Sequence, residues 1–205
     1  MILHDFALSS ASYRVRIALN LKGLDYETRS YRLRAGDQRG ADYIAINPAG
    51  LVPTLEIDGR IITQSLAIID YLDATRVEPR LIPVDPAERA RVLAIAFTIA
   101  CDVHPLNNLR VLQYLETVMG QDGTARDAWY RTWISSGFAA IEAALHTKPE
   151  TPFVAGDAPG IAEVCLVPQV FNARRFKIEL GSFPRLVEVA DRAAGLAAFA
   201  KAAPS

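Results

Sequence analysis

Residues 47–65, NPAGLVPTLEIDGRIITQS, decide the fold of the first part of this chain. Within them, Thr54–Ile57 and Arg60–Thr63 are two short runs of β-prone residues. Asp58-Gly59 separates the runs, and Asp-Gly in that position is a strong signal for a two-residue β-hairpin turn. The stretch therefore predicts a hairpin of two antiparallel strands.

Pro53 stands immediately before the first predicted strand. Proline has no N–H to give to a strand ladder, so it belongs at the leading end of a strand. The backbone N–H and C=O of Val52 are then unclaimed by a neighbouring strand, and an extended peptide can pair with them.

A helix is expected directly after the hairpin, opened by Gln64 and Ser65 and with apolar positions at Leu66, Ile69 and Leu72. Ser65 is a good N-cap residue. The N–H groups and the partial positive charge of a helix N-terminus favour a bound carboxylate. A peptide-pairing edge beside a carboxylate cradle is thus predicted, and an ordinary hairpin with a capped helix is the alternative.

The elements around the hairpin follow a thioredoxin-like order. Residues 2–6 predict a strand, and Tyr13, Ile17 and Leu21 share one face of a helix. Residues 26–31 predict a second strand, and a polar loop with a short helix leads on to the hairpin. The order β-α-β-α-β-β-α predicts an α/β thioredoxin-like domain over residues 1–76, with helices on both faces of a mixed sheet.

The second part of the chain predicts an all-α domain. Residues 77–83 contain two prolines and no periodicity, which indicates a linker before residues 84–205. Pro86 can occupy the first turn of a helix, and Pro105 is expected to kink or end that helix. Further helices are expected at residues 161–176 and 184–193.

A long helix of the second part carries a regular apolar spacing. Trp129, Trp133, Ile141 and Leu145 lie four or eight residues apart, with Gly137 in the missing position. This spacing predicts a buried stripe in which Gly137 allows a close approach between helices.

Composition narrows the class of protein. The 205 residues are 51% hydrophobic and 22% charged, with a net charge of −1. The chain therefore lacks the excess of positive charge that is typical of proteins that bind nucleic acid or an anionic membrane. No apolar run approaches the length of a membrane span, and the N-terminus has no signal-peptide pattern. A cytoplasmic protein is expected.

Cysteine and histidine residues give no metal or redox motif. Cys101 and Cys165 have no CxxC spacing and are expected to be buried thiols. His4, His104 and His146 are scattered, and the chain has no HExxH, P-loop or GxGxxG motif. We therefore expect no metal site and no nucleotide site.

The layout and several motifs resemble the cytosolic glutathione transferases, and in particular the zeta class with its maleylacetoacetate isomerases. The similarity runs over nearly the whole chain. The motifs are residues 9–19 (SSASYRVRIAL), 47–48 (NP), 52–55 (VPTL), 64–69 (QSLAII), 164–170 (VCLVPQV) and 175–177 (RFK).

The resemblance implies a glutathione site and a homodimer. Val52, before a cis Pro53, would pair with the cysteinyl part of glutathione, and Gln64 and Ser65 would hold the γ-glutamyl carboxylate. Gln38 would touch the glycyl end. Ser9 would donate to the sulfur, with Ser10, Ala11 and Ser12 nearby, and Ser10 is the alternative donor. The resemblance also implies that His104 and Asn108 contact glutathione or line the mouth of the site.

The chemistry requires a stabilised thiolate. A free thiol with a pKa near 8.5 is mostly protonated at neutral pH, and the thiolate is the nucleophile. Lowering that pKa by about two units takes roughly 2.7 kcal/mol. A hydrogen bond to a charged acceptor contributes on the order of 1.5–3 kcal/mol, so Ser9 with the helix dipole is about sufficient.

The reaction implied by the resemblance is cis–trans isomerisation of a dicarboxylic diketo acid. The thiolate adds to the cis double bond, the bond rotates, and the thiolate is expelled, so glutathione acts as a cofactor. Cationic groups are needed to bind the dianion and stabilise the enolate. Arg175 is the first candidate and Arg110 the second, and surface charge is the alternative role for both.

Departures from the family pattern leave rivals open. Leu8 stands where many members carry arginine, Ala11 replaces a frequent cysteine, and Gly160 replaces a Ser or Thr helix cap. Maleylpyruvate isomerase, a transferase or dehalogenase acting on α-halo acids, and a non-catalytic glutathione- or partner-binding protein are the alternatives.

Overall fold

Four short strands form one mixed sheet in the order β2-β1-β3-β4. Strand β1 pairs parallel with β2 and antiparallel with β3, which pairs antiparallel with β4. The predicted hairpin is confirmed, because β3 and β4 have the expected bounds. The strands are β1 (Ile2–Asp5), β2 (Glu27–Ser30), β3 (Thr54–Ile57) and β4 (Arg60–Thr63).

The hairpin turn has the geometry that its sequence predicts. Asp58 and Gly59 both have positive φ angles, 52° and 70°, as a two-residue turn of this kind requires. The Asp58 carboxylate accepts hydrogen bonds from Arg76 at 2.7 and 2.8 Å and from the Tyr71 hydroxyl at 2.8 Å. These bonds, those from Arg76 first, lower the pKa of Asp58 to about 2. The turn is therefore tied to the helix that follows it.

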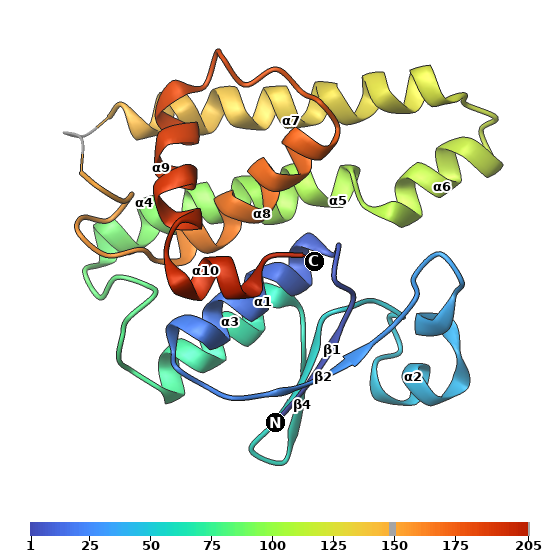
Figure 1. Ribbon diagram of the computed structural model, residues 1–205, viewed down its shortest axis with the longest axis horizontal. Helices are drawn as coiled ribbons and strands as arrows, with labels where there is room; N and C mark the ends of the chain where they lie inside the picture. The colour runs from blue at the N-terminus through green and yellow to red at the C-terminus, as the bar shows by residue number, and fades with distance from the viewer. Residues whose placement is uncertain (148–150, 205) are drawn as a thin grey trace. The chain divides into compact units, whose positions relative to one another are not determined.

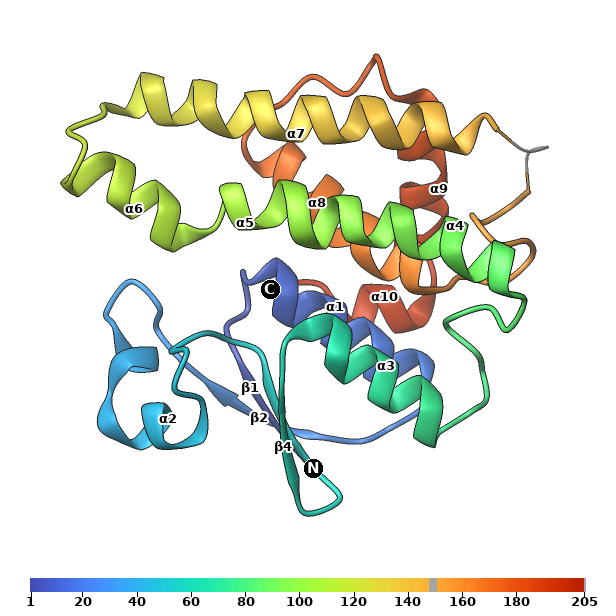
Figure 2. The same cartoon turned by 180° about the vertical axis from the view of Figure 1, so that it is seen from behind.

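The computed structural model describes residues 1–147 and 151–204. Around the sheet, α1 and α3 lie on one side and α2 on the other, as both views show (Figures 1 and 2). This arrangement confirms the predicted thioredoxin-like fold. The helices are α1 (Ser10–Leu21), the 3-10 turn η1 (Asp37–Arg39), α2 (Ala41–Ile46), α3 (Ser65–Thr75) and α10 (Ala197–Ala202).

The core of this unit lies between the sheet and the two long helices. Leu3 and Leu55 are paired across β1 and β3, so they share one face of the sheet, and both are fully buried. Ile17 of α1 and Ile69 of α3 are equally inaccessible. Burying side chains of this size stabilises the fold by about 1.5–3 kcal/mol each.

Apart from an isolated bridge between Phe153 and Gly156, the described residues of the second unit form helices joined by loops and turns, with no strand. The all-helical prediction is thereby confirmed. The helices are α4 (Pro86–Phe97), the π-helical turn η2 (Thr98–Val103), α5 (His104–Leu106), α6 (Leu109–Thr117), α7 (Gly123–Leu145), α8 (Ile161–Arg175) and α9 (Pro184–Ala194).

The first helical run of this unit ends at Leu106, one residue after Pro105, in line with the prediction. Pro86 occupies the first turn of α4, and Asp85 caps the helix by accepting from the Glu88 N–H at 2.8 Å. The run widens into η2 just before Pro105. Proline removes one backbone hydrogen bond and crowds the carbonyl one turn earlier, and a π-turn relieves that crowding.

The predicted stripe on α7 is partly wrong. The buried side chains at its start are Tyr130 and Ile134, whereas Trp133 is 36% exposed. A helix repeats every 3.6 residues, so a strict spacing of four drifts off the buried face. The close approach at Gly137 is confirmed, because a Cβ there would lie 2.1 Å from Val103 Cγ2.

The compact units differ from the predicted domains at two places. The first unit comprises Met1–Ile82 and Gly195–Ser205, and the second Pro83–Ala194. The predicted linker joins the first unit largely because Lys22 donates to the carbonyl oxygens of Arg76 and Pro79, at 2.7 and 2.6 Å. The end of the chain, predicted as part of the helical domain, returns to α1.

Side chains of α1 hold this returning segment. Arg16 donates through Nε to the Ala202 carbonyl at 2.9 Å, and Asn20 donates to the Ala198 carbonyl at 2.9 Å. Arg16 is itself fixed by the buried Asp5 carboxylate at 2.7 and 2.9 Å. These long-range contacts explain why the sequence pattern alone did not place α10.

Two further expectations fail. Cys165 is buried as predicted, but Cys101, which lies in the π-helical turn, is exposed.

Pro86–Thr117 is long and apolar enough to pass a length-and-composition test for a membrane span, so the expectation that no run approaches that length is wrong. Core helices of globular proteins pass the same test, and Ile95 and Ile99 of this run are buried within the unit.

Candidate functional site

The sheet register brings three chain segments to one end of the first unit. Thr54, the first residue of β3, pairs with His4 near the end of β1 and with Thr63 at the end of β4. The segments that follow β1 and β4 therefore lie at the same end as the segment that precedes β3. The segment after β1 carries the start of α1, the segment after β4 carries the start of α3, and the segment before β3 carries the Val52-Pro53 bond.

The start of α1 is built on Ser9. Its backbone is extended, and its Oγ accepts a hydrogen bond from the Ser12 N–H at 3.2 Å, which makes Ser9 the N-cap. The hydroxyl hydrogen points to no acceptor among the described residues and can donate to a ligand. Ser10 and Ser12 are buried and Ala11 is half-buried, so Ser9 is the hydroxyl at this helix start that combines access with donor capacity.

The Val52-Pro53 bond is cis, as the resemblance implied. Val52 lies just before β3 and makes no backbone hydrogen bond to another described residue. Both its N–H and its C=O are therefore available to an extended peptide. A second cis bond, between Glu78 and Pro79, was not predicted.

The start of α3 corrects the predicted cap. Gln64, rather than Ser65, is the N-cap residue, and it has a φ of 69° and makes no side-chain capping bond. Ser65 is already helical and is buried, while the Gln64 side chain is exposed. The pattern could not reveal the positive φ, which shifts the helix start by one residue. The first N–H groups of α3 are left without a side-chain cap, which suits a carboxylate.

Arg14 is a residue that sequence reasoning did not select for the site. It projects from α1, is 1% exposed, and donates through Nη1 to the Ser65 Oγ at 3.3 Å. A buried guanidinium beneath the start of α3 adds positive charge to the helix terminus. Its place in the motif SSASYRVRIAL was visible, but its burial was not, because arginine on a helix is usually solvated.

Gln38 lies in η1 with its side chain buried. Its Nε2 donates to the Leu33 carbonyl at 3.3 Å, and its Oε1 has no hydrogen-bond partner among the described residues. A buried oxygen of this kind indicates that a donor from outside the described chain is expected there. The loop position fits the predicted contact with the glycyl end of glutathione.

The second unit carries the remaining candidate residues, and three of them flank the helix break at Pro105. Asn108 is the N-cap of α6 and accepts from the Arg110 N–H at 3.1 Å. The Arg110 side chain is exposed, and His104 is half-buried in α5. The break therefore presents His104, Asn108 and Arg110 within one short segment.

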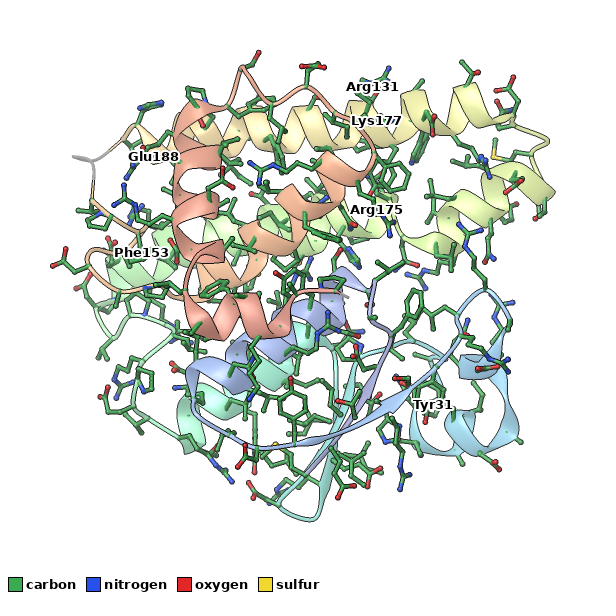
Figure 3. The ribbon with its side chains drawn as sticks, in the orientation of Figure 1. Tyr31, Arg131, Phe153, Arg175, Lys177 and Glu188 are labelled. Carbon is green, nitrogen blue, oxygen red and sulfur yellow. The ribbon has the colours of Figure 1, made fainter. Side chains whose placement is uncertain are left out.

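Arg175 ends α8 and is exposed (Figure 3). Its guanidinium carbon lies 5.1 Å from the centre of the Phe176 ring. Phe176 in turn stacks on Tyr130, with ring centres 3.8 Å apart. Burial raises the pKa of Tyr130 to about 12, and the charge of Arg175 opposes that rise. The aromatic stack gives Arg175 a fixed platform while its charge stays accessible.

Within residues 1–147 and 151–204, no three His, Cys, Asp or Glu side chains gather as a metal site would need. The first unit offers instead one hydroxyl donor, one unpaired backbone edge and one uncapped helix start. Such a set can bind a peptide that carries a carboxylate and stabilise an anion beside the hydroxyl.

Comparison with known proteins points to one family. The pattern of the glutathione S-transferase N-terminal domain matches residues 8–75. A probable maleylacetoacetate isomerase of Vibrio cholerae is 48% identical over 208 residues, covering 100% of this chain and 95% of the relative. A bacterial zeta-class maleyl pyruvate isomerase in its holo form has a TM-score of 0.97 at 42% identity, covering 100% and 97% of the two chains.

A second solved structure adds ligands to the comparison. The maleylacetoacetate isomerase of Methylobacterium extorquens AM1, with bound malonate and GSH, has a TM-score of 0.93 at 37% identity. The match covers 100% of this chain and 96% of that one.

Proposed function

This chain belongs to the zeta-class glutathione transferases, the family of the maleylacetoacetate isomerases, and we propose that it converts maleylacetoacetate into fumarylacetoacetate with glutathione as cofactor. The observation that carries this proposal is the convergence, at one end of the sheet, of Ser9, the cis Val52-Pro53 bond and the uncapped start of α3. A relative solved with bound malonate and GSH supports glutathione as the cofactor.

The residues present fit a γ-glutamyl tripeptide. Val52 offers a donor and an acceptor in extended geometry to the cysteinyl unit. Gln64 and Ser65 stand at the helix start that receives the γ-glutamyl carboxylate, with Arg14 donating to Ser65 from below. Gln38 Oε1 is a buried acceptor without a partner in the described chain, which suits the glycyl amide. Ser10, Ala11 and Ser12 shape the first turn of α1 around the sulfur.

When bound, glutathione supplies a thiolate that adds to the cis double bond and leaves after rotation. Ser9 stabilises that charge. Its oxygen already accepts from the Ser12 N–H, and its hydroxyl hydrogen can still be donated to the sulfur. A hydrogen bond to a charged acceptor contributes about 1.5–3 kcal/mol, and the N-terminal dipole of α1 adds to it. Together these are about enough to lower a thiol pKa by two units, which takes roughly 2.7 kcal/mol.

Exposed arginines bind the diacid. Arg175 is held over Phe176 with its charge accessible, and its planar fork can pair with a carboxylate through two hydrogen bonds. Arg110, beside His104 and Asn108 at the break before α6, is a second cation for the same dianion. Leu8 is exposed and carries no charge, so this position supplies no cation for the dianion.

The protein acts in the cytoplasm as a homodimer. Membership of the zeta-class glutathione transferases supports this part of the proposal. Light scattering at micromolar concentration tests the dimer, and a monomeric mass would contradict it.

The test of the proposed function is turnover of maleylacetoacetate and maleylpyruvate, each with and without glutathione. We expect turnover of maleylacetoacetate that depends on glutathione and exceeds that of maleylpyruvate. Faster turnover of maleylpyruvate would assign the chain to that substrate instead. If neither acid reacts, turnover of an α-halo acid would indicate a transferase or dehalogenase. Glutathione binding without any turnover would indicate a binding protein.

A further inference from the structure

Two side chains converge on the backbone carbonyl that precedes Val52. The Tyr43 hydroxyl donates to the Leu51 oxygen at 2.6 Å, and Asn47 Nδ2 donates to the same oxygen at 2.7 Å. Both donors come from α2 and the residue that ends it. One carbonyl oxygen thus has both lone pairs engaged by side chains.

The same two side chains also contact the residue that follows Pro53. The Tyr43 hydroxyl lies 2.9 Å from Thr54 Oγ1, and Asn47 Nδ2 lies 3.2 Å from that oxygen. Thr54 is fully buried at the start of β3. Leu51 and Thr54, which flank the Val52-Pro53 dipeptide, are therefore both hydrogen-bonded to the same two side chains.

Burial keeps the Tyr43 hydroxyl protonated and therefore able to donate a hydrogen bond. Tyr43 is 2% exposed and Asn47 is 4% exposed. Desolvation by burial raises the pKa of Tyr43 above its ordinary value, although hydrogen bonds to Thr54 and Asn47 oppose the rise, so the hydroxyl keeps its proton near neutral pH. Asn47 Oδ1 accepts from the Ala49 N–H at 3.1 Å, which orients its amide nitrogen toward Leu51.

We infer that Tyr43 and Asn47 are positioning residues that hold the Val52 backbone in the extended form that pairs with bound glutathione. This inference rests on the proposed function and deepens it. Val52 lies in a loop and pairs with no strand among the described residues. Its backbone conformation is therefore not fixed by sheet hydrogen bonds, and other contacts have to fix it. Holding it in advance reduces the ordering cost that a ligand would otherwise meet on binding.

Tyr31 provides a matched control. Its ring packs on the Tyr43 ring with centres 4.5 Å apart, and it projects from the end of β2 (Figure 3). Its hydroxyl, however, lies 2.7 Å from His4 Nδ1, and His4 Nε2 lies 2.7 Å from Glu56. Removing either tyrosine hydroxyl deletes one oxygen from the same aromatic cluster, but only the hydroxyl of Tyr43 contacts Leu51.

The test is calorimetric titration of glutathione into the full-length parent, Tyr43→Phe and Tyr31→Phe. Tyr43→Phe is expected to weaken glutathione affinity five- to tenfold, with kcat at saturating glutathione within twofold of the parent. Tyr31→Phe is expected to change affinity less than twofold. Asn47→Ala should reproduce the loss of Tyr43→Phe if its melting curve shows a folded protein.

A second ligand separates positioning from general stability. In a glutathione analogue whose cysteinyl amide N–H is replaced by an ester oxygen, the donor to the Val52 carbonyl is lost without added bulk. The effect of Tyr43→Phe should be smaller with this analogue, because only the Val52 N–H is left to pair with the cysteinyl unit. Equal affinity losses for Tyr43→Phe and Tyr31→Phe, or equal losses for both ligands, would overturn the inference. A parent protein that does not bind glutathione would overturn the proposed function itself.

Discussion

The starts of α1 and α3 lie at the same end of one sheet, yet α1 has a side-chain cap and α3 has none. At α1, the Ser9 oxygen caps the Ser12 N–H, and its hydrogen remains available as a donor. At α3, Gln64 has a positive φ and provides no side-chain cap, and the Ser65 oxygen accepts from Arg14. One start therefore offers a side-chain hydroxyl, and the other offers backbone N–H groups.

Because of this difference, we expect the two helix starts to have different roles in the proposed reaction. A hydroxyl directed at the sulfur stabilises a charge that matters to the reacting bond. Backbone groups directed at a remote carboxylate interact equally with ground state and transition state. The first should govern turnover, and the second should govern affinity.

The start of α8 in the other unit is a closed terminus, by which we mean a helix start whose N–H groups are hydrogen-bonded within the protein. The Glu163 carboxylate accepts from the Gly160 N–H at 2.8 Å and from the Val154 N–H at 2.7 Å. Glu163 is fully buried, and desolvation raises its pKa. Because its donors are satisfied from within the protein, this terminus serves stability rather than binding.

The largest predicted effect separates the start of α1 from the others. Ser9→Ala should lower kcat about thirtyfold, since losing ~2 kcal/mol of thiolate stabilisation corresponds to that factor. Glutathione affinity should change less than threefold. Steady-state kinetics between pH 6 and 8 measure both quantities. If Ser9→Ala keeps the parental rate and Ser10→Ala loses it, Ser10 is the donor instead.

Substitutions at the start of α3 should give the opposite kinetic signature. Gln64→Ala and Ser65→Ala should raise the KM for glutathione about tenfold. Each removes a side-chain donor that supplements the backbone N–H groups, and one hydrogen bond to a charged group contributes about 1.5 kcal/mol. The kcat at saturating glutathione should stay within twofold. Calorimetry of glutathione binding provides the check, and unchanged affinity in both variants would place the carboxylate elsewhere.

A substitution in the helical unit should affect the other substrate. Arg175→Gln should raise the KM for the diacid several-fold and leave glutathione affinity unchanged, because we propose that the guanidinium pairs with a substrate carboxylate. Arg175→Lys should restore only part of the loss, since lysine offers a point charge rather than a planar fork. Arg174→Gln is the matched control, because Arg174 already pairs with Asp191 at 2.6 Å. Equal KM values for Arg175→Gln and the parent would remove Arg175 from the substrate site.

The smallest effect is expected at the closed terminus of α8. Gly160 has an extended backbone, with φ −135° and ψ −157°, which any residue can adopt. Replacing glycine by a hydroxyl-bearing cap gains a few tenths of a kcal/mol, so Gly160→Thr should raise the Tm by about 1 °C and leave turnover unchanged. Differential scanning calorimetry measures the shift. A clear fall in Tm would mean that the buried site has no space for the threonine side chain.

The contrast between the units also explains what the sequence could predict. The hairpin was predicted to the residue, because Pro53 and Asp58-Gly59 fix both ends of β3 by local chemistry alone. The pairing edge at Val52 followed from the same prolyl constraint. The start of α3 was misplaced by one residue, because nothing in the pattern distinguishes the positive φ of Gln64 from an ordinary cap.

Features that depend on distant contacts were missed. The burial of Arg14 and the return of α10 to α1 depend on contacts between residues far apart in sequence. Cys101 was placed in the core because a regular helix was assumed, whereas a π-helical turn changes which side chains face inward. The roles predicted for His104, Asn108 and Arg110 came from family resemblance and stay predictions, and the charges on this segment alone would indicate an ordinary surface.

The most direct test of the central claim is the pKa of the glutathione thiol bound to the protein, measured from the ultraviolet absorbance of the thiolate across pH. The Ser9 hydroxyl and the start of α1 should lower this pKa by about two units from the ordinary thiol value near 8.5. In Ser9→Ala the pKa should move most of the way back, whereas in Ser65→Ala it should stay at the parental value. A bound thiol with an ordinary pKa in the parent, or the same pKa in the parent and Ser9→Ala, would contradict the account.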